Sequence, residues 1–147
     1  MLTGMFMNTY FPRLDEKGRL ILPAKFRDRL ADGLVMTKGQ ERCVYVYSVE
    51  VFTEIAARMA SVPTTSKKVR DFGRMLLAGA SEEVPDRQGR ITIPPSLRQY
   101  AGIDRELAVV GAGNRVEVWD AAAWARYVEA TEAGYADTAE EVYPGVF

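Results

Sequence analysis

The stretch Asp15-Glu-Lys-Gly18-Arg19-Leu-Ile-Leu-Pro23-Ala-Lys-Phe-Arg27 occurs twice in this chain, the second time in related form. Its counterpart reads Asp86-Arg-Gln-Gly89-Arg90-Ile-Thr-Ile-Pro94-Pro-Ser-Leu-Arg98. The aspartate, the glycine, the first proline and two arginines coincide at an offset of 71 residues, with aliphatic residues at matching places between them. The chain therefore contains an internal duplication, and this duplication is the strongest guide to its fold.

The match continues downstream of the quoted stretches. Val44–Tyr47 aligns with Val116–Trp119 at an offset of 72, and Phe52 then meets Trp124. One additional loop residue explains the change of offset. Two copies of one motif, each of about 50 residues, thus account for most of the chain.

Each copy predicts the same series of elements. A turn with a glycine suited to positive φ leads into a short aliphatic strand, and a proline then begins a short helix. A β-hairpin and a longer helix follow, with Ser48 and Asp120 at the helix N-cap positions. The predicted ranges are the turn 14–19, strands 20–22 and 91–93, helices 24–30 and 95–101, hairpins 34–47 and 107–119, helices 49–60 and 121–130, and a linking helix 67–77.

Neither half has enough strands to be stable alone in water. The sequence therefore predicts a β-rich α+β fold in which both repeats share one core around a pseudo-two-fold axis, with peripheral helices. We divide the chain into a first repeat (5–60), a linking helix (61–80), a second repeat (81–130) and an acidic segment (131–147) without basic residues, for which we expect mobility.

Composition excludes several classes of chemistry. The 147 residues are 48% hydrophobic and 27% charged, as in a folded globular protein, and they include one cysteine and no histidine. Histidine-dependent catalytic couples and zinc sites are therefore excluded, and no nucleophile–base pair stands out, so we predict no enzyme, metal or cofactor. The sequence shows neither a secretion signal nor a membrane-spanning run, which predicts a cytoplasmic protein; Met1, Met5 and Met7 are candidate starts.

The charge is unevenly distributed. Lysine and arginine number 19 against 20 aspartates and glutamates, a net charge of −1. Residues 1–75 carry 13 basic and 8 acidic side chains, whereas residues 76–147 carry 6 and 12. A basic first half can bind phosphates although the whole chain is nearly neutral.

The duplicated arginines are the candidate functional residues. Alternation along the strands places Arg19 and Ile21 on one face, and likewise Arg90 and Thr92, opposite the apolar side chains. Arginine suits bidentate contact with guanine and phosphate. The alternative is a salt bridge that only stiffens a turn, and the residues alone leave both interpretations open. The predicted DNA-binding set is Arg13, Lys17, Arg19, Arg87 and Arg90, and the predicted structural residues of the motif are Asp15, Gly18, Asp86 and Gly89.

The two Asp-x-x-Gly-Arg stretches, with Phe72-Gly-Arg-Met-Leu-Leu-Ala-Gly79 and Val118-Trp119-Asp120, resemble the MraZ family of bacterial transcriptional regulators, which carries two SpoVT-AbrB-type units. The resemblance covers residues 5–130. It implies a double-split β-barrel of the swapped-hairpin (AbrB-like) type, a nucleoid-associated homo-oligomeric ring, and repression of the chain's own cell-division and cell-wall operon. The partner it implies is double-stranded promoter DNA with repeated elements, without a membrane or a small-molecule substrate.

A second function class stays open beside this one. The doubled turns could serve as assembly contacts in a structural ring or protein-interaction module that does not read DNA. Two placements are also open for the acidic second half, which either faces away from DNA or lies against the basic surface of the next subunit.

Overall fold

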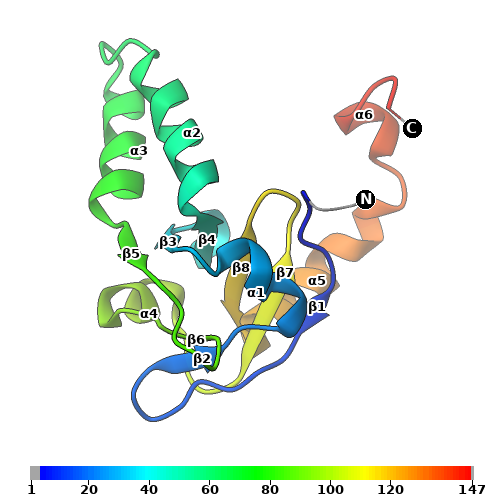
Figure 1. The fold of residues 1–147 in the computed structure, drawn as a ribbon. Coiled ribbons are helices and arrows are strands. Elements are labelled where there is room, and N and C mark those ends of the chain that lie inside the picture. The colour runs from blue at the N-terminus through cyan, green and yellow to red at the C-terminus, as the bar shows by residue number, and fades with distance from the viewer. Residues whose placement is uncertain (1–3, 147) are drawn as a thin grey trace.

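Antiparallel strands from both repeats form a six-stranded sheet in the computed structural model, which describes residues 4–146 (Figure 1). Met1, one of the candidate starts, and Phe147, the end of the acidic segment, lie outside the described residues. The strand order is β1-β7-β8-β4-β3-β5. These strands are β1 (Thr9–Tyr10), β3 (Leu34–Lys38), β4 (Val44–Ser48), β5 (Ser81–Glu83), β7 (Leu107–Gly111) and β8 (Val116–Asp120).

The remaining two strands pair with each other across the repeats. Strand β2 (Arg19–Ile21) runs antiparallel to β6 (Arg90–Thr92), with Leu20 opposite Ile91. The two predicted hairpins, β3–β4 and β7–β8, also meet across the repeats through the β4–β8 pairing. The predicted β-rich α+β class is confirmed, because strands of both repeats build common antiparallel sheets.

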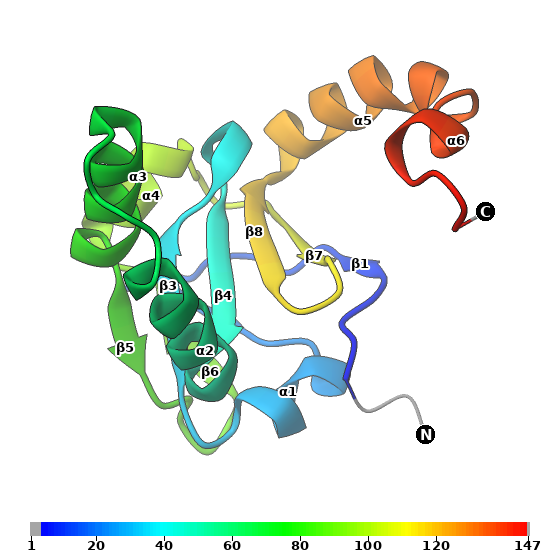
Figure 2. The same cartoon turned by 90° about the horizontal axis from the view of Figure 1, so that it is seen from above.

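Helices surround the sheets and form two projections. Figures 1 and 2 show the α2–α3 pair extending from one side of the molecule and the α5–α6 segment from the opposite side. The helices are α1 (Ala24–Leu30), α2 (Val49–Ala60), α3 (Lys67–Ala78), α4 (Pro95–Ala101), α5 (Ala121–Tyr135) and α6 (Ala139–Val142), with a 3₁₀ turn at Gln40–Arg42.

Local sequence signals located most helices. The predicted bounds of α1, α2 and α4 match those observed. The side chains of Ser48 and Asp120 accept hydrogen bonds from the N–H groups of Val51 and Ala123, which confirms both N-caps.

The structure differs from the sequence-based expectation in a few elements. The helix predicted to end at residue 130 continues to Tyr135, and α6 follows within the segment for which we expected mobility. Strands β1 and β5 were not predicted, because each is short and pairs with a strand distant in sequence. Strands β2 and β6 each begin one residue before the predicted position, at the motif arginine.

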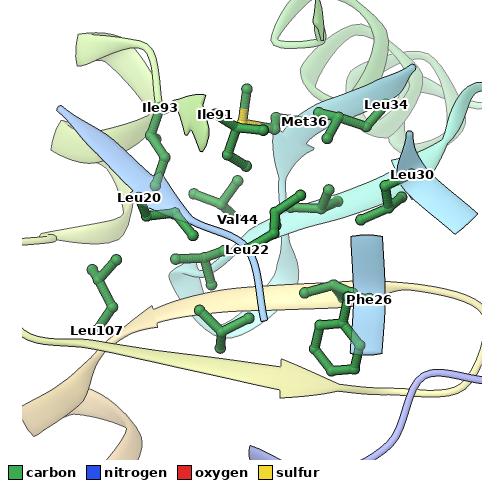
Figure 3. Close-up of a cluster of buried hydrophobic side chains, with 14 of the residues drawn as sticks. Leu20, Leu22, Phe26, Leu30, Leu34, Met36, Val44, Ile91, Ile93 and Leu107 are labelled. Carbon is green, nitrogen blue, oxygen red and sulfur yellow. The ribbon is translucent and has the colours of Figure 1, made fainter. Parts of the chain in front are cut away.

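The main hydrophobic core combines side chains from both repeats. Leu20 stands opposite Ile91 in the β2–β6 pair, Leu22 and Ile93 enter the same core, and all four are essentially inaccessible to solvent (Figure 3). Alternation along β2 and β6 sends these side chains inward, as expected from the sequence. Burial of this kind stabilises a fold by about 1.5–3 kcal/mol for each large aliphatic side chain.

A second, aromatic cluster anchors the start of α5 to the sheet. Trp124 and Tyr127 of this helix contact Trp119 of β8, with ring centroids 5.1 and 4.9 Å apart. Beneath them, Glu117 accepts hydrogen bonds from the indole N–H of Trp119 at 3.0 Å and from Nε of Arg115 at 2.9 Å. The first turns of α5 are therefore fixed, whereas residues 129–137 of the segment that follows are exposed.

A shared core predicts that equivalent substitutions in the two repeats act on one unfolding transition. We expect Leu22→Ala and Ile93→Ala each to lower the free energy of unfolding by about 2–5 kcal/mol, because each leaves a cavity in the same core. Urea denaturation followed by fluorescence measures this, since both tryptophans, Trp119 and Trp124, lie in the second repeat. A Leu22→Ala variant whose tryptophan transition is unchanged would contradict a common core.

Candidate nucleic-acid interface

Each motif forms a tight turn closed by backbone hydrogen bonds. In the first turn, the N–H of Asp15 donates to the carbonyl of Arg19 at 2.8 Å, and the N–H of Gly18 donates to the carbonyl of Asp15 at 3.0 Å. The second turn repeats this pattern between Asp86 and Arg90 at 3.1 Å. The duplicated sequence therefore produces a duplicated backbone geometry.

The aspartate organises the turn and holds the arginine with different oxygens. Asp15 Oδ1 accepts from the backbone N–H groups of Lys17 and Arg19, both at 2.9 Å, and Oδ2 accepts from Arg19 Nε at 2.8 Å. Asp86 does the same with Gln88 and Arg90, and its Oδ2–Nε distance is 2.7 Å. Each aspartate thus binds turn N–H groups and holds the guanidinium at the same time.

Pairing of β2 with β6 brings the two arginines to one face. In the register of the pair, Arg19 stands opposite Thr92, and Ile21 stands opposite Arg90. These four residues share the outer face, because the alternate positions, Leu20 and Ile91, point into the core. The outer face of the β2–β6 ribbon therefore carries two arginines at diagonal positions, with the half-exposed Ile21 beside them.

The turn glycines are required by both conformation and space. Gly18 and Gly89 adopt φ values of +77° and +76°, which glycine adopts without strain. A Cβ atom on Gly18 would lie 2.8 Å from Cζ of Arg98, and one on Gly89 would lie 2.7 Å from Nε of Arg27. Each turn thus packs against an arginine from the helix of the other repeat.

These helix arginines, Arg27 and Arg98, were not among the predicted site residues. The repeat alignment pairs them, and this was the signal that could have identified them. Arg27 Nε donates to the carbonyl of Leu22 at 2.9 Å, whereas Arg98 Nε is buried without a hydrogen-bond partner among the described residues. Their contacts with the opposite glycines make them positioning residues for the turns.

Glu83 is a further residue that sequence reasoning missed. Its carboxylate accepts a hydrogen bond from the N–H of Thr92 at 2.9 Å, so β5 connects the edge of the main sheet to the ribbon. Burial raises the pKa of Glu83 above the usual glutamate value. No local sequence signal identified this contact.

Hydrogen bonds lower the carboxyl pKa of both motif aspartates. The backbone N–H of Arg19 is the main cause of a lowered pKa at Asp15, and its guanidinium adds to this effect. At Asp86 the backbone N–H of Arg90 lowers the pKa most, followed by its side chain. Both carboxylates are therefore ionised at neutral pH, and both Asp–Arg pairs are charged.

The other predicted DNA-binding residues are distributed around the turns. Lys17 and Arg87 are exposed within the first and second turn, at positions that differ by one residue: Lys17 is two residues after its motif aspartate, and Arg87 is one residue after its own. Arg13 lies before the first turn, where its Nε is 3.7 Å from a carboxylate oxygen of Glu106, with both side chains exposed. The structure therefore places Lys17 and Arg87 in the turns but assigns Arg13 a surface ion pair.

None of the helices within residues 4–146 is long and apolar enough to cross a bilayer. The same residues contain no group of three or more cysteine, aspartate or glutamate side chains placed to hold a metal ion.

Comparison with known proteins gives consistent matches over nearly the whole chain. The family described as "MraZ protein, putative antitoxin-like" matches residues 5–75 and again residues 76–143. A protein of Kocuria rhizophila is 63% identical over 97% of this chain and 100% of its own length. Proteins of Clavibacter michiganensis and Micrococcus luteus are 60% and 57% identical over the same shares. All three are named "Transcriptional regulator MraZ".

The lowered pKa values predict a pH dependence for the turns. A carboxylate whose pKa is lower in the folded state stabilises the fold above its unfolded pKa, and this contribution is lost as the pH falls through the folded pKa. We expect NMR titration of the side-chain carboxyl carbons of Asp15 and Asp86 to give midpoints below the ordinary value of 3.8. In Asp15→Asn, the Asp86 midpoint should stay low, because its own turn is intact. Midpoints at or above the ordinary value in the parent protein would contradict these hydrogen bonds.

The glycine contacts predict that Gly18→Ala lowers the free energy of unfolding more than Gly102→Ala does. Gly102 also has a positive φ, +62°, but nothing lies within 4 Å of the position of its Cβ. Gly102→Ala should cost only about 1–2 kcal/mol of backbone strain. Gly18→Ala should cost clearly more, because its Cβ also displaces Arg98.

Chemical denaturation measures both free energies of unfolding. In an Arg98→Ala background the additional cost of Gly18→Ala over Gly102→Ala should shrink, since the displaced side chain is gone. Equal costs in the parent protein would show that the cross-repeat contact does not constrain the turn.

Proposed function

Because this chain belongs to the MraZ family, whose relatives are transcriptional regulators by name, we propose that it regulates transcription by binding promoter DNA through the β2–β6 ribbon. The observation that carries the proposal is the common outer face of the ribbon, where Arg19 and Arg90 are each oriented by an aspartate. A two-stranded β-ribbon fits the major groove of B-DNA.

Oriented arginines suit base recognition. The Nε–H groups of Arg19 and Arg90 are donated to Asp15 and Asp86, and bidentate pairing with guanine O6 and N7 uses the other guanidinium N–H donors. Restricting the guanidinium before binding reduces the conformational entropy lost on complex formation. The aspartates therefore both build the turn and prepare the arginine for contact.

The remaining residues of this face suit other contacts. Ile21 is 49% exposed on the outer face of the ribbon, opposite Arg90, where an aliphatic side chain can contact a thymine methyl group. Lys17 and Arg87, in the exposed turns, suit phosphates on either side. Arg13 suits a more peripheral phosphate once its exposed pairing with Glu106 is exchanged for the DNA backbone.

We further propose a homo-oligomeric ring that represses the chain's own cell-division and cell-wall operon by engaging repeated promoter elements. A ring presents its ribbons at fixed spacing, so the first contact raises the effective concentration for the next. Association with the nucleoid follows from such binding. The proposal includes no cofactor, small-molecule substrate or enzymatic activity.

The proposed architecture is a double-split β-barrel of the swapped-hairpin type. The β2–β6 pairing between repeats and the β4–β8 pairing between hairpins support it. In this architecture both repeats belong to one folding unit. Its parts are the first repeat (5–60), the linker (61–80), the second repeat (81–130) and the acidic segment (131–147).

Alanine substitution of the motif arginines tests the DNA interface. We expect Arg19→Ala and Arg90→Ala each to weaken binding to a DNA fragment from upstream of the chain's own gene by about 5- to 150-fold, the range for one bidentate base contact. Affinity should be measured at several salt concentrations, with a scrambled fragment of equal length beside it. For the parent protein the affinity should fall steeply with salt.

The matched control is Arg126→Ala, which removes an exposed arginine from α5, away from the ribbon. This variant should bind the promoter fragment like the parent protein. Native mass spectrometry without DNA should give one assembly mass for all four proteins. If Arg19→Ala and Arg90→Ala leave binding unchanged, the site assignment is wrong; if both instead dissolve the assembly, the turns are assembly contacts, as in the alternative function.

A further inference from the structure

An apolar groove lies between α2 and α3. These two helices form the projection on the side of the molecule opposite α5 (Figures 1 and 2). The volume of the groove is about 840 Å³. The lining includes Met59 on α2 and Phe72 and Leu77 on α3, and the last two are 51% and 47% exposed. Large apolar side chains gathered in an exposed groove are typical of a surface that binds another protein segment.

The two helices have little contact with the body of the protein. No residue of α2 is fully buried, and Leu76 is the one fully buried residue of α3 among the described positions. A Cβ atom on Gly73 of α3 would lie 3.8 Å from Cε of Met59, an ordinary van der Waals distance, so α2 and α3 approach each other at this point. The exposed side chains of Phe72 and Leu77 lie along the groove between the two helices.

Basic side chains surround this apolar surface. Helix α3 carries four basic residues and a single acidic one, Asp71. Lys67 pairs with Asp71 at 2.5 Å, whereas Arg70 donates to the neutral carbonyls of Thr64 and Thr65. Lys68, Arg70 and Arg74 all border the groove, so its rim is positively charged.

The C-terminal segment has the complementary properties. Residues 131–147 contain four acidic residues and no basic ones. Tyr135, Val142 and Val146 are 75%, 61% and 66% exposed there, although they are apolar or aromatic. The segment leaves the body after the aromatic cluster at the start of α5, and Figures 1 and 2 show its end far from the α2–α3 pair of the same chain.

We propose that the acidic C-terminal segment of one copy, comprising the end of α5 and α6, binds in the basic-rimmed α2–α3 groove of a neighbouring copy. Tyr135 and Val142 would cover Phe72 and Leu77, while Glu132, Asp137 and Glu141 would face Lys68 and Arg74. Opposite charges at the rim determine the partner and the orientation, and the apolar contacts supply most of the affinity.

A contact between the α2–α3 grooves of two copies is less favourable than a contact between the groove and the acidic segment. A groove-to-groove contact would place Lys68 and Arg74 of both copies together, and like charges across an interface are unfavourable. Such an isologous contact also closes at two copies, whereas contact between different surfaces continues from copy to copy and forms a ring when the rotation between copies closes. The inference rests on the proposed oligomeric function and identifies the contact that forms the ring.

Cysteine crosslinking in the full chain tests the contact without DNA. Leu77→Cys and Val142→Cys are made on separate chains with different affinity tags, and the two chains are co-expressed. The native Cys43 is fully buried, and burial raises the pKa of its thiol, so it should not react with a short bismaleimide. We expect a covalent pair that contains both tags and joins positions 77 and 142, and no such product from the parent chain.

Three outcomes of these measurements would overturn the inference. A pair formed by Leu77→Cys alone would show that grooves face each other. An assembly of unchanged mass without the 77–142 product would place the ring contact elsewhere and leave the groove to a different macromolecule, while the proposed function stands. A monomeric parent protein in native mass spectrometry would remove the proposed ring as well, and its DNA binding is measured separately.

Charge exchange provides a second, independent readout. We expect Lys68→Glu with Arg74→Glu to weaken self-association about tenfold, as several partly exposed ion pairs would. Reversing Glu132, Asp137 and Glu141 to lysine should have a similar effect, and both sets combined in one chain should restore assembly. Arg126→Glu is the control and should not alter the mass distribution; failure of the combined chain to recover association would contradict the pairing.

Discussion

The structure depends on a reciprocal exchange of backbone hydrogen bonds between the two repeats. The N–H of Leu22 donates to the carbonyl of Gly89 at 2.8 Å, and the N–H of Ile93 donates to the carbonyl of Gly18 at 2.9 Å. Between these bonds lies the three-residue pairing of β2 with β6. These N–H and carbonyl groups lie at the edge of a hydrophobic core. Without the other repeat they would be left unpaired there, which would lower the free energy of unfolding. Each repeat therefore supplies the hydrogen-bond partners that the other repeat needs.

The turns that take part in this exchange also carry the residues of the proposed DNA interface. Asp15 and Asp86 close the turns, lower the freedom of Arg19 and Arg90, and keep both pairs charged at neutral pH. The turn glycines accept the cross-repeat bonds and lie against arginines of the opposite helices. Each turn is therefore held both by its own aspartate and by the strand end and helix arginine of the other repeat.

The fold separates the basic and acidic parts of the chain in space. The basic α3 helix and the acidic C-terminal segment extend from opposite sides of the body, so charges that nearly cancel in the composition are far apart in the molecule. Neither projection contributes to the main core, which consists of strand, α1 and α4 side chains together with Phe6 and Leu14 of the N-terminal segment. Their exposed apolar residues therefore have little role in the stability of the single chain, and they remain available for contacts between copies.

The amino-acid sequence by itself determined the duplication, the turn glycines, both N-caps, the bounds of α1, α2 and α4, and the outward direction of Arg19 and Arg90. These features depend on residues a few positions apart, through proline and capping preferences and strand alternation. Only the tertiary structure decided the pairings of β1 and β5, such as Thr9 with Val110, and the register that places both arginines on one ribbon. It also decided the contacts of Arg27 and Arg98 with the opposite turns. These contacts join residues about 45 to 100 positions apart, and their choice depends on chain closure and on packing of the whole core, which no local pattern encodes.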